Sequence, residues 1–278
     1  GLATFVRDNL RRNFGFILPT TDISGGVNVA IKHAEILVKN GYDVTLIDAV
    51  SKRVHHKSKK SYSYRTEVPG FNVLTAYGVE VEGHFDTMVA TVWTTVKNAF
   101  EYPNVKRRMY FVQSFEPDFY VYGAGDPRVL ANATYCDETG SLEYVTMSRW
   151  CERWLKEKYN KSSRVCSNGI NLDNYPVKTR DFSKNSKIKI LIEGDSSSEY
   201  KNTDEAFRIV QLLDPEKYHV SYLSYRKEPK DWYRVDHFYN RISPEKVGHV
   251  YAGCDILIKT SILESFSYPP LEMMATGG

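Results

Sequence analysis

The chain has 278 residues, 42% of them hydrophobic and 26% charged, which suits a globular protein large enough for two domains. Its formal net charge of +3 is too small to indicate a nucleic-acid partner, and no apolar run reaches the ~18 residues that a membrane helix needs. We see no signal peptide at the start, so we expect a cytoplasmic protein.

The first part of the chain predicts a strand, a helix and a second strand. Asn13–Thr20 is a short apolar run that ends beside a proline, which indicates a buried strand. Val27–Gly41 has apolar residues at helical spacing and stops at an Asn-Gly pair. Tyr42–Val50 is apolar again. This order predicts a βαβ unit, the building block of a doubly wound parallel sheet.

The same rhythm continues less regularly toward the middle of the chain. The predicted elements are strands at Phe85–Trp93, Arg107–Phe115 and Glu143–Trp150, a helix at Cys151–Tyr159 and a strand with a turn at Ser163–Ile170. Residues 171–187 hold few apolar side chains and indicate a linker. We therefore predict one domain over residues 1–170 and another over residues 188–278.

The second domain repeats the α/β order. Strands are predicted at Ile188–Gly194, Tyr218–Tyr225 and Asp255–Ser261, and helices at Thr203–Leu213 and Ser243–Cys254. Thr203 and Ser243 are the expected N-caps, and Pro244 suits a first helical position. The predicted fold class is therefore α/β, with two Rossmann-like parallel-sheet domains facing a cleft. Ligands of such sheets bind off the carboxyl ends of the strands.

The closing stretch, "ESFSYPPLEMMATGG", holds two glutamates around two prolines. Proline is favoured at a first helical position, so a helix is expected to begin near Pro270, with Glu272 in its first turn. The unpaired N–H groups of that turn and the helix dipole would suit a phosphate. Glu264 falls in the preceding loop. The alternative is ordinary: a first-turn glutamate also stabilises a helix by itself, and loop glutamates are usually solvated.

Tyr251–Gly278 resembles the donor-site signature of retaining glycosyltransferases with the GT-B fold, the family 4 group. The segment at 24–47 resembles the opening glycine loop and helix of that group, and Arg164–Asn171 resembles the turn that ends its acceptor domain. The resemblance implies an enzyme that moves a sugar from a nucleoside diphosphate sugar to a hydroxyl of a glycan, with retention. Members continue with a further strand and helices, so we expect the second domain to be incomplete here.

The resemblance also assigns roles to residues of the closing stretch. It implies that Glu264, the catalytic candidate, contacts hydroxyls of the donor sugar, and that Glu272 contacts the nucleotide ribose. The backbone between them would hold sugar or phosphate oxygens. The donor-binding candidates there are Ser265, Phe266, Ser267 and Tyr268.

Further donor-binding candidates lie elsewhere in the chain. The family has a Gly-Arg pair and a later lysine that bind the diphosphate, whereas this chain keeps Gly194 and Lys201 but has Asp195 in place of the arginine. Lys201 is either a phosphate ligand or a plain surface lysine. Gly25 and Gly26 would let the donor approach the backbone closely, or would only form a tight turn.

The acceptor-side candidates are Gln113, Glu116 and His84. Gln113 and Glu116 follow a strand, in a segment that resembles rhamnosyltransferases that use dTDP-rhamnose, as does Ala131–Cys136. His84 precedes a strand and is either near the reacting carbon or an ordinary loop histidine. The basic segment Ser51–Arg65 is either a solvated loop or a contact with a lipid-linked acceptor or the inner membrane face.

We expect no cofactor and no required metal, because no Asp-x-Asp motif occurs. Two alternatives stay open: a nucleotide-sugar epimerase of GT-B shape, and a non-catalytic module that binds nucleotide sugars. The cysteines form no C-x-x-C pair and are predicted to be reduced, mostly buried thiols of a cytosolic protein; a catalytic role for one of them has no local signature in its favour. They are Cys136, Cys151, Cys166 and Cys254.

Overall fold

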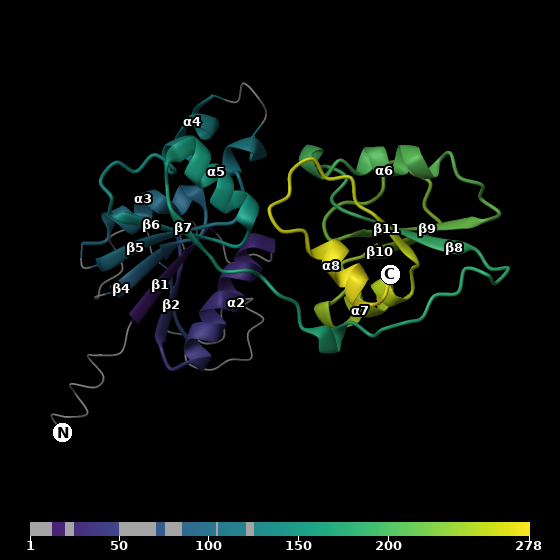
Figure 1. Cartoon of the computed structure of the whole chain (residues 1–278), viewed down its shortest axis with the longest axis horizontal. Coiled ribbons are helices and arrows are strands. Elements are labelled where there is room, and N and C mark those ends of the chain that lie inside the picture. The colour runs from purple at the N-terminus through teal and green to yellow at the C-terminus, as the bar shows by residue number, and fades with distance from the viewer. Residues whose placement is uncertain (1–12, 20–24, 50–70, 76–84, 104, 121–124) are drawn as a thin grey trace. The chain divides into compact units, whose positions relative to one another are not determined.

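The computed structural model describes residues 13–19, 25–49, 71–75, 85–103, 105–120 and 125–278. It divides into two compact units, unit 1 over Gly1–Asn168 and unit 2 over Gly169–Gly278. Each unit has its own parallel sheet and its own helices (Figure 1). The prediction of an α/β chain with two parallel-sheet domains is confirmed.

Unit 1 contains a seven-stranded parallel sheet in the order β3-β2-β1-β4-β5-β6-β7. Its strands are β1 (Asn13–Leu18), β2 (Asp43–Asp48), β3 (Phe71–Thr75), β4 (Phe85–Ala90), β5 (Val105–Val112), β6 (Leu142–Thr146) and β7 (Ser163–Val165). Its helices are α2 (Gly25–Lys39), α3 (Trp93–Glu101), α4 (Asp126–Ala133) and α5 (Arg149–Tyr159), with a 3-10 turn η2 (Glu116–Phe119).

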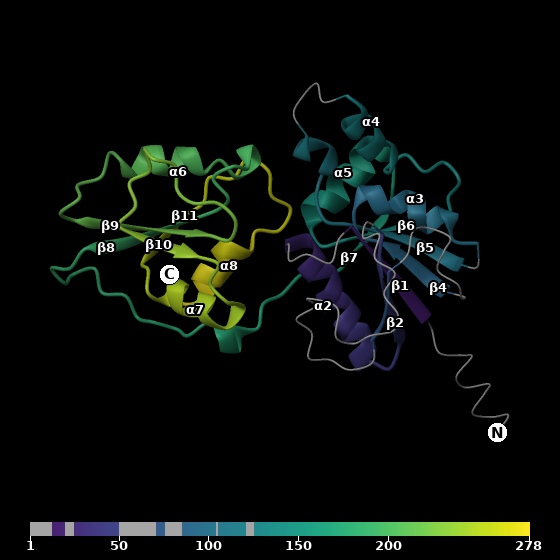
Figure 2. The ribbon, with the colours of Figure 1, turned by 180° about the vertical axis from the view of Figure 1, so that it is seen from behind.

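Helices cover both faces of this sheet. Helix α2 lies on one face and α3, α4 and α5 lie on the other, as the two opposite views show (Figures 1 and 2). The carboxyl-terminal halves of the central strands β1, β4 and β5 are apolar because both of their faces are covered; Ile17 and Leu18 of β1 are fully buried. The direction of winding reverses between β1 and β4, so the carboxyl ends of these strands form a topological switch point, where such sheets bind ligands.

Unit 2 contains a four-stranded parallel sheet in the order β10-β9-β8-β11. Its strands are β8 (Ile188–Glu193), β9 (Tyr218–Ser224), β10 (His237–Asn240) and β11 (Ile256–Ile258). Its helices are α6 (Thr203–Val210), α7 (Pro244–Ala252) and α8 (Tyr268–Ala275), with 3-10 turns η3 (Leu172–Asn174) and η4 (Glu199–Lys201). The switch point of this sheet lies between β8 and β11.

The period-2 alternation of β8 places its side chains in two separate cores. Ile190 and Ile192 pack with α6 in one core, where the Phe207 ring stacks on Tyr233 at 3.8 Å between centroids. Leu191 packs on the opposite face with α7 and with Met273 of α8. Figure 1 shows α6 on one side of this sheet and α7 and α8 on the other.

Among the strands and α-helices of the described residues, four were not predicted from the sequence, namely β3, α3, α4 and β10. Helix α3 begins with four aromatic or β-branched residues, which favour strands in isolation. It forms because Thr95 Oγ1 accepts hydrogen bonds from the backbone N–H groups of Thr91 and Val92, at 3.0 and 3.3 Å. A local side-chain bond therefore overrides the propensity of the sequence.

Two predicted helix starts need correction. Ser243 does occupy the N-cap position of α7, as predicted, but its side chain makes no capping hydrogen bond. Thr203 is the first helical residue of α6 and not its N-cap; that position belongs to Asn202, which has φ of 50°. The Thr203 hydroxyl instead lies 2.9 Å from the Tyr233 hydroxyl. Helix α8 begins at Tyr268, two residues before the expected start at Pro270.

Candidate functional site

Predicted site residues meet at the carboxyl edge of the unit 2 sheet. Gly194 directly follows β8, Lys201 ends the 3-10 turn after it, and Glu264 lies in the loop after the neighbouring strand β11. The Nζ atom of Lys201 lies 2.8 Å from Oε1 of Glu264, and both side chains are about three-quarters buried. Burial lowers the pKa of Lys201, but the Glu264 carboxylate outweighs this, so the pKa lies above its ordinary value.

Lys259 is a second cation at this edge, and sequence reasoning missed it. Its Nζ atom lies 2.9 Å from Oε2 of Glu193 and 3.8 Å from Oε1 of Glu264. Only 9% of the Lys259 side chain is exposed. The sequence could have indicated this lysine, because Lys259 directly follows the apolar strand "ILI". Ligands of parallel sheets bind at the carboxyl ends of the strands.

We call Glu193, Lys201, Lys259 and Glu264 the edge cluster. The ammonium groups of Lys201 and Lys259 both approach Glu264, at 2.8 and 3.8 Å, and Lys259 also pairs with Glu193 at 2.9 Å. An anionic ligand that displaced Glu264 would therefore find two cations already in place, held in a partly desolvated site where charge interactions are stronger than in water. Carboxylates and ammonium groups in this arrangement suit a ligand with both phosphate and hydroxyl groups.

Gly194, directly after β8, has no side chain, so Thr203 and Lys259 can pack against its backbone. Its φ is +148°, and a Cβ at this position would lie 2.7 Å from Cγ2 of Thr203 and 3.6 Å from Nζ of Lys259. Asp195 turns back on its own loop, where its Oδ1 accepts hydrogen bonds from the backbone N–H and the hydroxyl of Ser197, at 2.9 and 2.7 Å. One oxygen of the Asp195 carboxylate is thus hydrogen-bonded within its own turn.

Glu272 lies in the second turn of α8, not in the first as predicted, because the helix begins at Tyr268. Burial raises the pKa of the Glu272 carboxyl to about 7, against the opposite effect of a hydrogen bond from Tyr175. Pro269 and Pro270 occupy the second and third helical positions and have no N–H. The first turn of α8 therefore offers a phosphate fewer donors than the sequence suggested.

The loop before α8 holds the remaining donor-binding candidates. Ser265 and Phe266 are half-buried, and Ser267 is the N-cap residue of α8. The rings of Phe266 and Tyr268 meet edge-to-face with centroids 5.0 Å apart. Within the described residues, the buried hydroxyls of Ser261 and Ser267 have no hydrogen-bond partner. Such groups are costly in a folded protein unless something else satisfies them.

The carboxyl edge of the unit 1 sheet brings Gly26 and Gln113 together. Gly25 and Gly26 are the first residues of α2, where the sequence predicted a loop. Gln113 follows β5, and its Nε2 donates to the carbonyl oxygens of Gly26 and Thr91, at 3.0 and 3.3 Å. This one amide joins the segments after β1, β4 and β5, so it fixes the backbone at the switch point of unit 1.

Glu116 lies inside unit 1, where only 2% of the residue is exposed, and not at an open edge as expected. Its Oε2 accepts a hydrogen bond from the Trp93 backbone N–H at 2.6 Å, at the start of α3. Burial raises the pKa of Glu116 to about 8, although the hydrogen bond from the Trp93 backbone opposes this. The contacts indicate that Glu116 anchors α3. His84 and Ser51–Arg65 lie outside the described residues.

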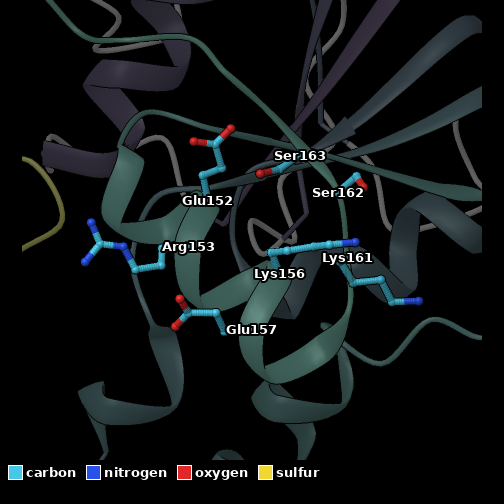
Figure 3. Close-up of a pocket in the computed structure, with 7 residues that line it drawn as sticks. All are labelled: Glu152, Arg153, Lys156, Glu157, Lys161, Ser162 and Ser163. Carbon is cyan, nitrogen blue, oxygen red and sulfur yellow. The ribbon is translucent and has the colours of Figure 1, made fainter.

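A surface hollow elsewhere in unit 1 contains none of the predicted site residues. It lies beside α5 and the start of β7, and Figure 3 shows that charged side chains of both signs surround it. Its lining is Glu152, Arg153, Lys156, Glu157, Lys161, Ser162 and Ser163. None of these lining residues is hydrophobic or aromatic, as most residues of ligand pockets are, so the hollow is not a candidate site.

Within the described ranges, no helix combines the length and the apolar character needed to cross a membrane. In the same part of the chain, no group of three or more His, Cys, Asp and Glu side chains is arranged to hold a metal ion.

No protein-family model and no curated protein matches the chain. Solved structures do match. HepE from Anabaena, in complex with UDP and glucose, is 14% identical over 96% of this chain and 79% of its own, with a TM-score of 0.66. WaaG, a glycosyltransferase involved in lipopolysaccharide biosynthesis, is 13% identical over 95% of this chain and 79% of its own, with a TM-score of 0.65. A glycosyltransferase from Rickettsia africae is 13% identical over 96% of this chain and 78% of its own, with a TM-score of 0.64.

At these low identities the similarity concerns the fold. It extends through both units, because each match covers at least 95% of the chain. The chain therefore has the α/β fold of these proteins, with two Rossmann-like parallel-sheet domains of the GT-B type, as the sequence predicted.

Proposed function

We propose that the protein is a glycosyltransferase that moves a sugar from a nucleoside diphosphate sugar to a hydroxyl of a glycan acceptor. The observation that carries this proposal is the edge cluster: Lys201 and Lys259 meet Glu264 beside Gly194, at the switch point of the unit 2 sheet. The fold supports it, since HepE, which has the same fold, binds UDP and glucose.

In this proposal the cations bind the diphosphate. Lys201 is the principal phosphate ligand, and Lys259 assists from the end of β11, so that a lysine provides the positive charge that Asp195 does not. Both are point charges that stabilise the leaving diphosphate as the glycosidic bond breaks. Gly194 allows the ligand to approach the backbone of the β8 loop closely.

The two glutamates bind the neutral parts of the donor. Glu264 exchanges its ion pair for the hydroxyls of the sugar, where its carboxylate stabilises positive charge that develops on the ring. Glu272 binds the ribose, together with backbone groups of Ser265, Phe266, Ser267 and Tyr268. With a pKa of about 7 for its carboxyl, Glu272 can accept or donate a hydrogen bond at neutral pH.

The finer features of the function are also proposals. They are membership of the family 4 group, retention of configuration, activity without a metal, rhamnose as the donor sugar, and a role in polysaccharide biosynthesis. A lipid-linked glycan as acceptor would bring the protein to the inner membrane face. In unit 1, Gly25, Gly26 and Gln113 stay candidate ligand contacts at the carboxyl edge of the sheet.

The test is a thermal-shift screen of the full chain against UDP-, GDP- and dTDP-sugars, followed by an assay for nucleoside diphosphate release with and without glycan acceptors. A ligand at 100 times its Kd adds about 2.7 kcal/mol to the free energy of unfolding, which a melt detects. Acceptor-dependent release that survives EDTA supports a metal-independent transferase. No stabilisation by any of the nucleotide sugars would refute the proposal.

A second candidate function is a non-catalytic module that binds nucleotide sugars. The observation in its favour is Asp195, whose carboxylate is bonded into its own turn where a transferase of this type would have a cation. Donor binding without release of nucleoside diphosphate, with a range of acceptors, would favour this candidate over the transferase.

A further inference from the structure

Three polar side chains from two separate parts of unit 1 meet beside the last strand of its sheet. Cys166 directly follows β7 and is exposed, Asn168 lies two residues further on, and His33 belongs to α2. Cys166 Sγ lies 3.8 Å from His33 Nδ1, and His33 Nε2 lies 3.2 Å from Asn168 Oδ1. These residues take no part in the edge cluster.

The hydrogen bonds around Asn168 determine which nitrogen of His33 carries the proton. The Nδ2 group of Asn168 donates to Met147 Sδ at 2.9 Å, so its Oδ1 is the atom that faces His33. An amide oxygen can only accept, so His33 Nε2 must donate to it. In the neutral ring Nδ1 then has a free lone pair, and it points to the Cys166 thiol.

The arrangement is thus a nucleophile, a base and a group that orients the base. This is the geometry by which proteins activate a weak nucleophile. The His33 ring is also held by Phe111, whose ring meets it edge-to-face with centroids 5.0 Å apart. The orientation of the base is therefore fixed by contacts on two sides.

We propose that Cys166 is an activated thiol that forms mixed disulfides with low-molecular-weight disulfides. The Cys166 proton moves to His33 Nδ1, and the thiolate attacks one sulfur of the disulfide. A new S–S bond forms to Cys166 while the original S–S bond breaks. The other half leaves as a thiolate, and the proton on His33 passes to it or to water.

Cys136 provides a matched comparison within the same unit, because it is also a free and exposed thiol. Its Sγ donates to the carbonyl oxygen of Asn132 at 3.6 Å, and a carbonyl oxygen cannot take the proton. The other two cysteines, Cys151 and Cys254, are buried. The two exposed thiols therefore differ in the atom that Sγ contacts, a histidine nitrogen at Cys166 and a carbonyl oxygen at Cys136.

The expected difference in rate follows from the chemistry of thiols. A free cysteine is only a few per cent thiolate at neutral pH. A base that takes the thiol proton raises the share of thiolate, while the accompanying fall in nucleophilicity removes part of the gain. We therefore expect Cys166 to react at least about threefold faster than Cys136.

The test uses the aromatic disulfide DTNB at pH 7 on the folded full chain, with adducts located by peptide mass spectrometry. Cys136→Ser leaves Cys166 as the exposed thiol, and Cys166→Ser leaves Cys136. The first variant should react at least about threefold faster. His33→Asn, which puts an amide near the position of Nδ1, is then added to each variant. In Cys136→Ser it should abolish the rate advantage of Cys166, and in Cys166→Ser it should leave the rate at Cys136 unchanged.

Two results would overturn the proposal. One is an equal or slower rate at Cys166 than at Cys136, which needs no histidine variant and so does not depend on whether that variant folds. The other is a rate advantage of Cys166 that survives His33→Asn in a protein whose melt shows that it is folded.

Discussion

Replacing Glu116 with Gln should change how the stability of unit 1 depends on pH. The pKa of this carboxyl rises from 4.5 to about 8 on folding because the group is buried. The folded protein therefore keeps the proton up to about pH 8, whereas the unfolded chain releases it near pH 4.5. Stability is fully present below the unfolded pKa and is lost as the pH rises through the folded pKa.

The size of the effect follows from the shift. Each unit of pKa corresponds to 1.36 kcal/mol. About three units of the rise from 4.5 to about 8 lie above pH 5, so about 4 kcal/mol of the free energy of unfolding is lost between pH 5 and pH 9. Gln has no proton to release, and its Oε1 can still accept the bond from the Trp93 backbone N–H. The Glu116→Gln protein should therefore lose much less stability over this range.

The assay is urea unfolding at pH 5, 7 and 9, followed by tryptophan fluorescence, which reports chiefly on unit 1 because three of the four tryptophans lie there. Glu138→Gln, at an exposed position of the same unit, is the control and should behave as the unchanged protein. If Glu116→Gln and the unchanged protein lose the same stability between pH 5 and pH 9, the Glu116 carboxyl does not stay protonated in the fold and the reasoning is refuted.

Three further predictions concern unit 2. Lys201→Ala should weaken binding of a nucleoside diphosphate by roughly 1.5–3 kcal/mol but leave the nucleoside almost unaffected in calorimetric titrations, because the lost contact is charge-assisted; an equal loss for both would contradict it. Gly194→Ala should lower the Tm, since its Cβ would lie 2.7 Å from a methyl group, whereas Gly169→Ala, with no atom within 4 Å, should not. In steady-state kinetics, Glu264→Gln should lower kcat by ~100-fold and Glu272→Gln should mainly raise the KM for donor; identical profiles would refute these roles.

Much of the fold could be predicted because its strands are buried on both faces. The apolar runs that begin at Asn13 and Ile188 stand out in the sequence, and the helices after them have clear apolar spacing. Helix α3 could not be found in this way, because its first residues prefer strands and its start is held by hydrogen bonds to Thr95 and Glu116. The strand and helix propensities of single residues carry no information about such hydrogen bonds.

Glu264 and Glu272 became site candidates from the sequence because they belong to one motif. Lys259 was missed because its significance comes from a strand pairing: β11 lies beside β8, which brings Lys259 to Glu193, 66 positions away. Glu116 was placed at an open edge because a residue after a strand often lies there. The structure turns it inward to the start of α3, a tertiary contact that no spacing in the sequence indicates.

The most direct test of the central claim is hydrogen–deuterium exchange of the full chain with and without the nucleoside diphosphate that stabilises it most. The account predicts slower exchange of backbone amides in two segments, at 193–202 and 259–274, because the ligand binds over the edge cluster and the loop before α8. Protection confined to other segments, with these two unchanged, would contradict the claim that the carboxyl edge of the unit 2 sheet is the donor site.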